Sequence, residues 1–269
     1  MPEVTDRVRD NPWIRPDDPI VIAHRGHSIA VPENTMAAYR RAVELGAQMI
    51  EADVNVTRDG HLVMIHDWTL DRTTNGSGHV HDATLDEVQR LDAGARFDGG
   101  HDRLRIPTTD DLVRFAGEAG ILLCLEIKGA DADEADRIGI DLVDLIVRHD
   151  ALDRTFVSSY HHRAMAGAKA RVPELRLAPE RLPDDVPADP ADASAQASRL
   201  GAPVIQNHWK YLTEALVERL HADRIAIWAW PTTEPDGIEV SLDLGVDALM
   251  GDDVPAMVDA IARRRPATS

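Results

Sequence analysis

Eight short apolar runs alternate with amphipathic segments along nearly the whole chain, and this rhythm constrains the fold most strongly. The amphipathic segments have the apolar spacing of helices, and several of them end at a glycine, as at Gly46, Gly201 and Gly245. Eight strands that are each followed by a helix predict a parallel (β/α)₈ barrel, the TIM-barrel architecture, with a doubly wound open sheet as the alternative. The expected strands are 20–24, 48–54, 121–127, 155–160, 175–178, 203–206, 224–230 and 247–250.

One interval breaks this rhythm. Between His66 and Pro107 the chain runs through a polar stretch, a short helical pattern near 84–91 and a glycine-rich turn at 97–101. We therefore expect a small insertion over about 67–106, above the mouth of the barrel, where it would shape access for a substrate. The expected organisation is a single domain over 1–269, with the barrel over 20–262.

Charge and cysteine content limit the partners and the compartment that we expect for this chain. The 269 residues carry a formal charge of −18, which disfavours nucleic acid and anionic membrane surfaces. Residues 1–19 lack the pattern of a secretory signal, and no apolar stretch approaches the length of a membrane span. The single cysteine, Cys124, reads as a small buried residue and fits a reducing compartment, so we expect a cytoplasmic protein. The oligomeric state is not predicted.

Acidic residues lie on two expected strands in a pattern that suits a metal ion. Glu51 and Asp53 stand two residues apart and therefore on one strand face, and Glu126 and Lys128 repeat this spacing on a later strand. Three carboxylates that converge at a barrel mouth make an oxygen-ligand site for Mg²⁺ or Ca²⁺. The alternative is an ion pair of Glu126 with Lys128, with the other two carboxylates exposed at a frayed strand end.

Histidine and arginine stand where a phosphate ester would need them. His24 and Arg25 end the first expected strand, and His66 follows another apolar run. Two imidazoles that flank a phosphate can share general acid–base work, and Arg25 and Lys128 can bind the phosphate and take up transition-state charge. Trp228 and Trp230 share one strand face; we expect a substrate contact from Trp228, with core packing as the alternative.

Taken in order, these motifs make the chain resemble the glycerophosphodiester phosphodiesterase family from about 20 to 258. The resemblance is carried by His24-Arg25-Gly26, Pro32-Glu33-Asn34-Thr35, Glu51-x-Asp53, His66-Asp67, Leu70-x-Arg72-Thr73-Thr74-x-Gly76-x-Gly78, Ile106-Pro107-Thr108, Glu126-x-Lys128, Ser158-Ser159, Trp228 and Gly245-Val246-Asp247. It implies a divalent metal on Glu51, Asp53 and Glu126, and an acid–base pair of His24 and His66. It also implies phosphate contacts from Arg25 and Lys128.

Two positions depart from the family pattern. Pro231 follows Trp230 where the family often has residues that offer an amide side chain, and Gly251-Asp252 stands where Thr-Asp is common. The metal and histidine positions match.

The resemblance implies metal-dependent hydrolysis of a glycerophosphodiester to glycerol 3-phosphate and an alcohol. One alternative is phospholipase D-like hydrolysis of lysophospholipids on the same barrel. Another is a non-catalytic descendant that binds a phosphodiester.

Overall fold

The computed structural model describes residues 11–265, and in this range nine strands form one sheet. Eight of them follow the order β6-β5-β4-β2-β1-β9-β8-β7, and their neighbours pair in parallel. The end strands β6 and β7 are linked by an isolated parallel bridge between Glu180 and Gln206, which leaves the barrel nearly closed. The strands are β1 (Ile20–His24), β2 (Met49–Val56), β3 (Leu62–Met64), β4 (Leu122–Ile127), β5 (Thr155–Ser158), β6 (Arg176–Leu177), β7 (Val204–His208), β8 (Ala226–Trp230) and β9 (Ala248–Gly251).

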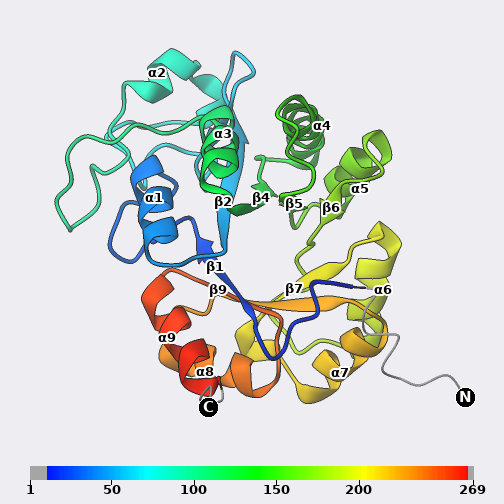
Figure 1. Ribbon diagram of the computed structural model, residues 1–269. Helices are drawn as coiled ribbons and strands as arrows, with labels where there is room; N and C mark the ends of the chain where they lie inside the picture. The colour runs from blue at the N-terminus through cyan, green and yellow to red at the C-terminus, as the bar shows by residue number, and fades with distance from the viewer. Residues whose placement is uncertain (1–10, 266–269) are drawn as a thin grey trace, which may run out of the picture.

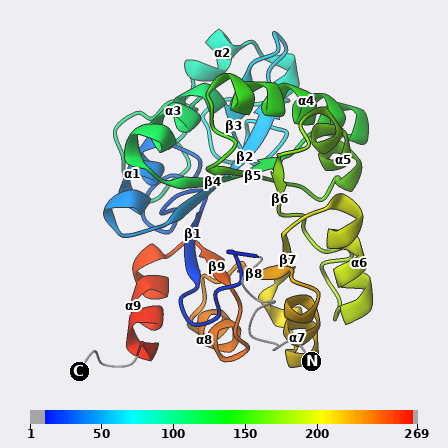
Figure 2. The same ribbon diagram turned by 45° about the vertical axis from the view of Figure 1, so that its right-hand side comes forward.

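Helices surround these strands, as Figures 1 and 2 show. The α-helices are α1 (Met36–Glu44), α2 (Leu85–Gln89), α3 (Thr109–Ala119), α4 (Ala132–Arg148), α5 (His162–Arg171), α6 (Pro190–Leu200), α7 (Glu214–Ala222), α8 (Pro235–Asp243) and α9 (Val254–Arg264), with short 3₁₀ turns η3 (Val80–Asp82) and η4 (Trp209–Tyr211). The eight-unit barrel predicted from the strand rhythm is confirmed, and the open sheet is wrong because the chain just after β6 pairs with β7 through the bridge between Glu180 and Gln206.

Hydrogen-bonding side chains start most of the helices. Thr35 accepts a hydrogen bond from the Ala38 N–H at the start of α1, and Thr108 forms a reciprocal capping box with Asp111 at the start of α3. Such caps satisfy backbone N–H groups that a helix leaves unpaired. They fix where each helix begins after its strand, and so they fix the loops at the barrel mouth.

Alternation along each strand separates two apolar layers. Inward-facing residues fill the barrel interior, among them Ile20, Ile22, Met49, Phe156 and Trp228. Outward-facing residues pack against the helices in a larger cluster. Cys124 is buried among the inward-facing residues, as the sequence predicts. Nearer the carboxyl ends of the strands, the inward-facing residues are polar, so the reactive side chains lie at the mouth of the barrel.

The segment after β2 departs from the regular barrel. β3 pairs antiparallel with β2, with Val54 opposite Met64. Beyond it, the segment that carries α2 lies at the top of Figures 1 and 2. This region has a small apolar cluster of its own: Val63, Ile65, Leu70, Val80, Val88, Ala93 and Ile106.

The predicted absence of a secretory signal concerns residues 1–19, and the first ten of these lie outside the described residues. None of the described helices combines the length and apolar character needed to cross a membrane.

Candidate active site

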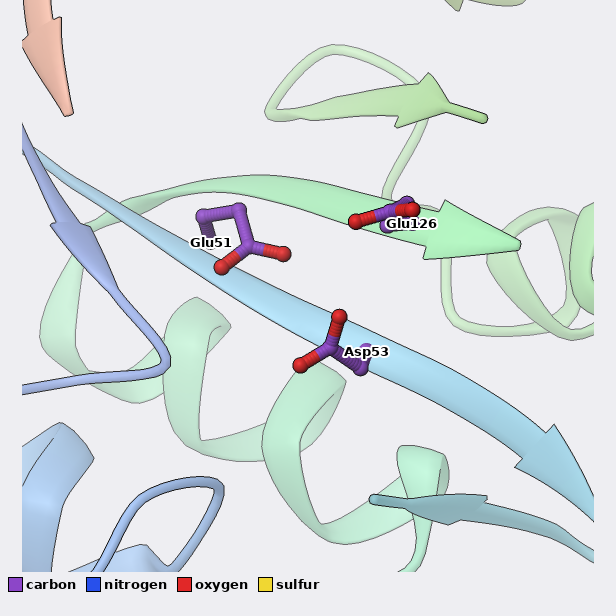
Figure 3. A group of neighbouring side chains, drawn as sticks. All are labelled: Glu51, Asp53 and Glu126. Carbon is purple, nitrogen blue, oxygen red and sulfur yellow. The ribbon is translucent and has the colours of Figure 1, made fainter. Parts of the chain in front are cut away.

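Three carboxylates from neighbouring strands converge inside the mouth of the barrel. Glu51 and Asp53 come from β2 and Glu126 from β4, and Asp53 lies directly beside Glu126 in the strand register. One carboxylate oxygen of each residue lies within 4.8 Å of the others. Figure 3 shows the three side chains on the same side of the two strands, pointing toward one another. All three residues are buried, so the alternative of exposed acids at a frayed strand end does not hold.

Each β2 carboxylate has one oxygen fixed by a neighbour and one oxygen without a hydrogen bond. Glu51 Oε2 accepts from the Arg25 backbone N–H at 3.0 Å, and Asp53 Oδ2 accepts from the Asn34 side-chain amide at 2.7 Å. Glu51 Oε1 and Asp53 Oδ1 are buried without a hydrogen-bond partner. Lys128 Nζ lies 3.2 Å from Asp53 Oδ1, whereas Glu51 Oε1 has neither a hydrogen bond nor an ion pair. A buried carboxylate oxygen of that kind is costly unless a cation or a proton neutralises it. The donor set therefore fits a divalent metal ion, which these three residues can hold.

Two protein cations also face the carboxylates. Lys128 Nζ lies 2.6 Å from Glu126 Oε1 and 3.2 Å from Asp53 Oδ1, so the predicted ion pair with Glu126 is present. Arg25 Nε lies 3.1 Å from Asp53 Oδ2, and its terminal nitrogen lies 3.0 Å from Glu33. Burial disfavours the charged lysine, but Glu126 and Asp53 outweigh it and raise the pKa of Lys128. Both cations therefore stay charged at the mouth.

The same surroundings move the pKa values of the two β2 acids in opposite directions. Burial, together with the nearby Asp53 and Glu126, raises the pKa of Glu51 well above its usual range. Burial also acts against the charge of Asp53, but Lys128 and Arg25 prevail and lower its pKa. Without a bound cation, Asp53 therefore keeps its negative charge more readily than Glu51 does.

Each of the two predicted histidines has a carboxylate on its Nδ1 atom. His24 Nδ1 lies 2.7 Å from Asp252 Oδ1, and His66 Nδ1 lies 2.6 Å from Asp67 Oδ1. A carboxylate at this position holds the proton on Nδ1, and the Nε2 atom of the ring then points away from that carboxylate. His24 Nε2 is 4.0 Å from Glu51 Oε2, on the side of the acidic group. Burial lowers the pKa of His66, so its neutral form is favoured at neutral pH.

Ion pairs connect these groups between turns that lie far apart in the sequence. Arg72 binds Asp67 through Nε at 2.7 Å and binds both carboxylate oxygens of Glu33 at 2.7 and 2.8 Å. Glu33 in turn pairs with Arg25. Arg72 of the insertion thus holds Asp67, the carboxylate partner of His66, while Glu33 in the turn before α1 holds Arg25.

One cavity of about 60 Å³ gathers the predicted groups. We call it the catalytic cavity. Its lining includes His24, Arg25, Glu51, His66, Glu126 and Lys128, together with Tyr160, Glu180, Gln206, Trp230 and Met250. Asp53 lies against it through its contacts with Arg25 and Lys128. The structure therefore brings together both histidines, both cations and the acidic group.

Trp228 does not join this assembly. Its side chain is fully buried in the barrel interior, where it packs edge to face on Phe156 with ring centroids 5.0 Å apart. Trp230, two residues later on the same strand face, lines the catalytic cavity instead. Trp228 thus lies too deep in the barrel interior to make the substrate contact expected of it, and Trp230 lines the cavity in its place.

Three polar residues of the site are absent from the sequence-based set. Asp252 orients His24, and its own oxygens also accept from Ser28 and Thr233 at 2.9 and 2.8 Å. Asp67 orients His66. Glu180 is a fourth buried carboxyl at the mouth, and its Oε2 has no hydrogen-bond partner. Burial and the charge of Glu126 raise the pKa of Glu180 well above its usual range.

Gly26 and Gly251 are required by close backbone approaches near this site. Gly26 has a φ of +88°, and a Cβ atom there would lie 2.7 Å from the backbone of Ala38 in α1. A Cβ atom on Gly251 would lie 2.5 Å from the Thr232 carbonyl oxygen. The glycine that departs from the family's common threonine therefore fits the local packing, and the following Asp252 still reaches His24.

This arrangement suits the cleavage of a phosphate ester. Two cations and a metal-competent carboxylate group can hold an anionic phosphate, and two oriented imidazoles can move protons on either side of it. General acid–base groups with phosphate-binding cations are the components that this reaction needs.

Comparison with known proteins agrees with the geometry. Residues 24–256 match the family model described as the glycerophosphoryl diester phosphodiesterase family. A glycerophosphodiester phosphodiesterase of Caldanaerobacter subterraneus is 35% identical over 246 residues, which cover 91% of this chain and 98% of that protein. A probable glycerophosphodiester phosphodiesterase 1 of Mycobacterium tuberculosis is 32% identical, over 85% of this chain and 87% of that protein.

A solved structure shares the fold over the same extent. The phosphodiesterase of Oleispira antarctica, solved in complex with the product sn-glycerol-3-phosphate, has a TM-score of 0.83 and 28% identity. The match covers 91% of this chain and 97% of that chain. With the family model spanning the barrel and a relative above 30% identity along nearly its full length, this chain belongs to the glycerophosphoryl diester phosphodiesterase family of phosphoric diester hydrolases.

Proposed function

We propose that this enzyme hydrolyses a glycerophosphodiester to glycerol 3-phosphate and an alcohol, with His24 and His66 as its acid–base pair. The observation that carries this proposal is the catalytic cavity, where both imidazoles lie with the phosphate-binding cations and the acidic group. Family membership and the product bound to the Oleispira antarctica enzyme support the substrate class.

Glu51, Asp53 and Glu126 would hold a divalent ion, for which their oxygen ligands favour Mg²⁺ or Ca²⁺. When bound, such an ion supplies positive charge that offsets the charge of the phosphate and of its transition state. Arg25 and Lys128 bind the same phosphate from the protein side and are held ready by Glu33 and Glu126.

The two histidines complete the proton balance of the reaction. One Nε2 accepts the proton of the nucleophile, which is either water or a neighbouring glycerol hydroxyl, as its oxygen bonds to phosphorus. The other Nε2 donates a proton to the leaving alkoxide as its bond to phosphorus breaks. Attack by the hydroxyl gives a cyclic phosphate, which water then opens to glycerol 3-phosphate with the two histidines in reversed roles. Asp252 and Asp67 contact the two Nδ1 atoms in the same way, which supports giving the two roles to the pair together.

Release of glycerol 3-phosphate from a glycerophosphodiester, followed by a coupled dehydrogenase assay, tests this function. We expect chelator to abolish turnover and Mg²⁺ or Ca²⁺ to restore it. The variant Glu51→Gln should stay inactive at every metal concentration while it keeps the circular dichroism of the wild type. Full turnover in chelator would show that Lys128 and Arg25 alone balance the acidic group, and would overturn the metal-dependent form of the proposal.

A further inference from the structure

A second space opens directly beside the catalytic cavity. This outer pocket measures about 420 Å³ and shares His66, Glu126, Lys128 and Tyr160 with the catalytic cavity. Its remaining lining comes from Asp67, Trp68, Thr69, Ile127, Gly129 and His161. The catalytic cavity holds about 60 Å³, so the organic groups of a phosphodiester must extend beyond it. The outer pocket offers that room on the side of His66.

Trp68 stands at the rim of the outer pocket with a large aromatic surface open to solvent. It is 54% exposed, although side chains of this size are usually well covered. Its backbone is fixed, because the Trp68 carbonyl accepts from the Val80 N–H at 2.9 Å and the next residue bridges to His79. An exposed ring on an anchored backbone is suited to cover a ligand.

Tyr160 presents a second, firmly held ring between the two spaces. Its hydroxyl donates to Asp184 at 3.0 Å, and its ring meets Trp230 edge-on with centroids 6.2 Å apart. The outer pocket thus has aromatic rings from two separate elements, the insertion and the end of β5.

The charges around the outer pocket favour a cationic occupant. Among its lining residues in the described chain, Lys128 carries the fixed positive charge, and its Nζ is already bound by Glu126 and Asp53. The two acids that line the pocket are paired as well, Glu126 with Lys128 and Asp67 with Arg72. Asp184, which accepts from the Tyr160 hydroxyl, adds a further negative charge beside the pocket, and the whole chain has a formal charge of −18. Aromatic faces in acidic surroundings are how proteins recognise bulky, weakly hydrated cations such as quaternary ammonium groups.

We propose that the outer pocket is the subsite for the leaving alcohol and that Trp68 and Tyr160 select a quaternary ammonium head group there. This inference rests on the proposed function, because it assigns the part of the substrate that lies beyond the phosphate. His66 borders both spaces, so a leaving alcohol that takes its proton from His66 in the catalytic cavity extends into the outer pocket.

The test compares three esters of glycerol 3-phosphate: the choline ester, its uncharged 3,3-dimethylbutyl isostere and the methyl ester. We expect wild type to have a higher kcat/KM for the choline ester than for the isostere of the same shape. Trp68→Ala should lower kcat/KM for the choline ester roughly 5–30-fold, as expected for a desolvated cation–π contact. The same variant should change the methyl ester by no more than about twofold. Trp68→Phe, which keeps an aromatic face, should recover most of the loss.

Two results would overturn the inference alone: an equal loss for all three esters, or equal kcat/KM of wild type for the choline ester and its isostere. An equal loss would place the common glycerol group, not the head group, against Trp68. Absence of hydrolysis of all three esters, the methyl ester included, would overturn the proposed function and this inference with it.

Discussion

Asp252 controls His24 without reaching the substrate, so its removal should lower turnover in a graded way. The perturbation is Asp252→Asn, which keeps the shape of the side chain but removes its charge. The carboxylate accepts from His24 Nδ1 at 2.7 Å and is itself held by Ser28 and Thr233, whose hydroxyls can keep an amide in place. The charge is real at neutral pH: burial acts against it, but the hydrogen bond from His24 prevails and lowers the pKa of Asp252 to about 2.

A hydrogen bond to a charged group contributes about 1.5–3 kcal/mol, whereas a neutral one contributes about 1 kcal/mol. Each 1.36 kcal/mol of transition-state stabilisation is a factor of about ten in rate. Asn can still accept a hydrogen bond from Nδ1 but carries no charge, so kcat of Asp252→Asn should fall roughly tenfold. Asp252→Ala loses both the charge and the acceptor and should lose roughly 100-fold. KM should change little, because Asp252 contacts the histidine and not the phosphate.

The chain offers a matched control for this experiment. His149 Nε2 lies 2.7 Å from Asp110 Oδ1, a histidine–carboxylate pair of the same length between α3 and the end of α4. Neither residue lines the catalytic cavity. Asp110→Asn should therefore leave kcat within about twofold of wild type. The reasoning is refuted if folded Asp252→Asn keeps wild-type kcat, or if Asp110→Asn loses as much as Asp252→Asn.

Two further predictions concern the histidines and the buried fourth carboxyl. His24→Ala and His66→Ala should each lower kcat by on the order of 100-fold or more, and a folded variant within a few-fold of wild type would end that assignment. The raised pKa of Glu180 means that the folded protein keeps a proton that the unfolded chain loses near its ordinary value of 4.5. The stability from this proton is full below that pH and is lost as pH rises through the folded pKa. Urea unfolding should therefore show Glu180→Gln gaining on wild type as pH rises above about 5, and a difference that stays constant with pH would contradict the burial argument.

The barrel was predictable because its information is local and periodic. Each strand is a short apolar run, and each is followed by a helix with a clear apolar face, so the order of elements fixes the topology. The two-residue spacing of Glu51 and Asp53 predicted a shared face correctly, because side chains alternate strictly along a strand. Family resemblance added the expected partners of these acids.

Sequence patterns missed residues whose role depends on how deep they lie in the barrel, and contacts between loops that are far apart in the chain. Trp228 and Trp230 share a face, and only the position of the barrel's apolar layer shows that the first is core and the second is mouth. Counting on by two from the inward-facing Ala178 and Met250 reaches Glu180 and Asp252, a signal that was present in the sequence. The Arg72 contacts to Glu33 and Asp67 join segments far apart in the chain, and no local pattern announces them.

The central claim is that Glu51, Asp53 and Glu126 hold one divalent ion beside both histidines. Anomalous diffraction from crystals grown with Mn²⁺, which prefers the same oxygen ligands, tests it most directly. We expect one anomalous peak in contact with oxygens of all three carboxylates, and loss of that peak in Glu51→Gln. A Mn²⁺-saturated crystal with no peak at this group, and with Lys128 still bridging Asp53 and Glu126, would contradict the claim.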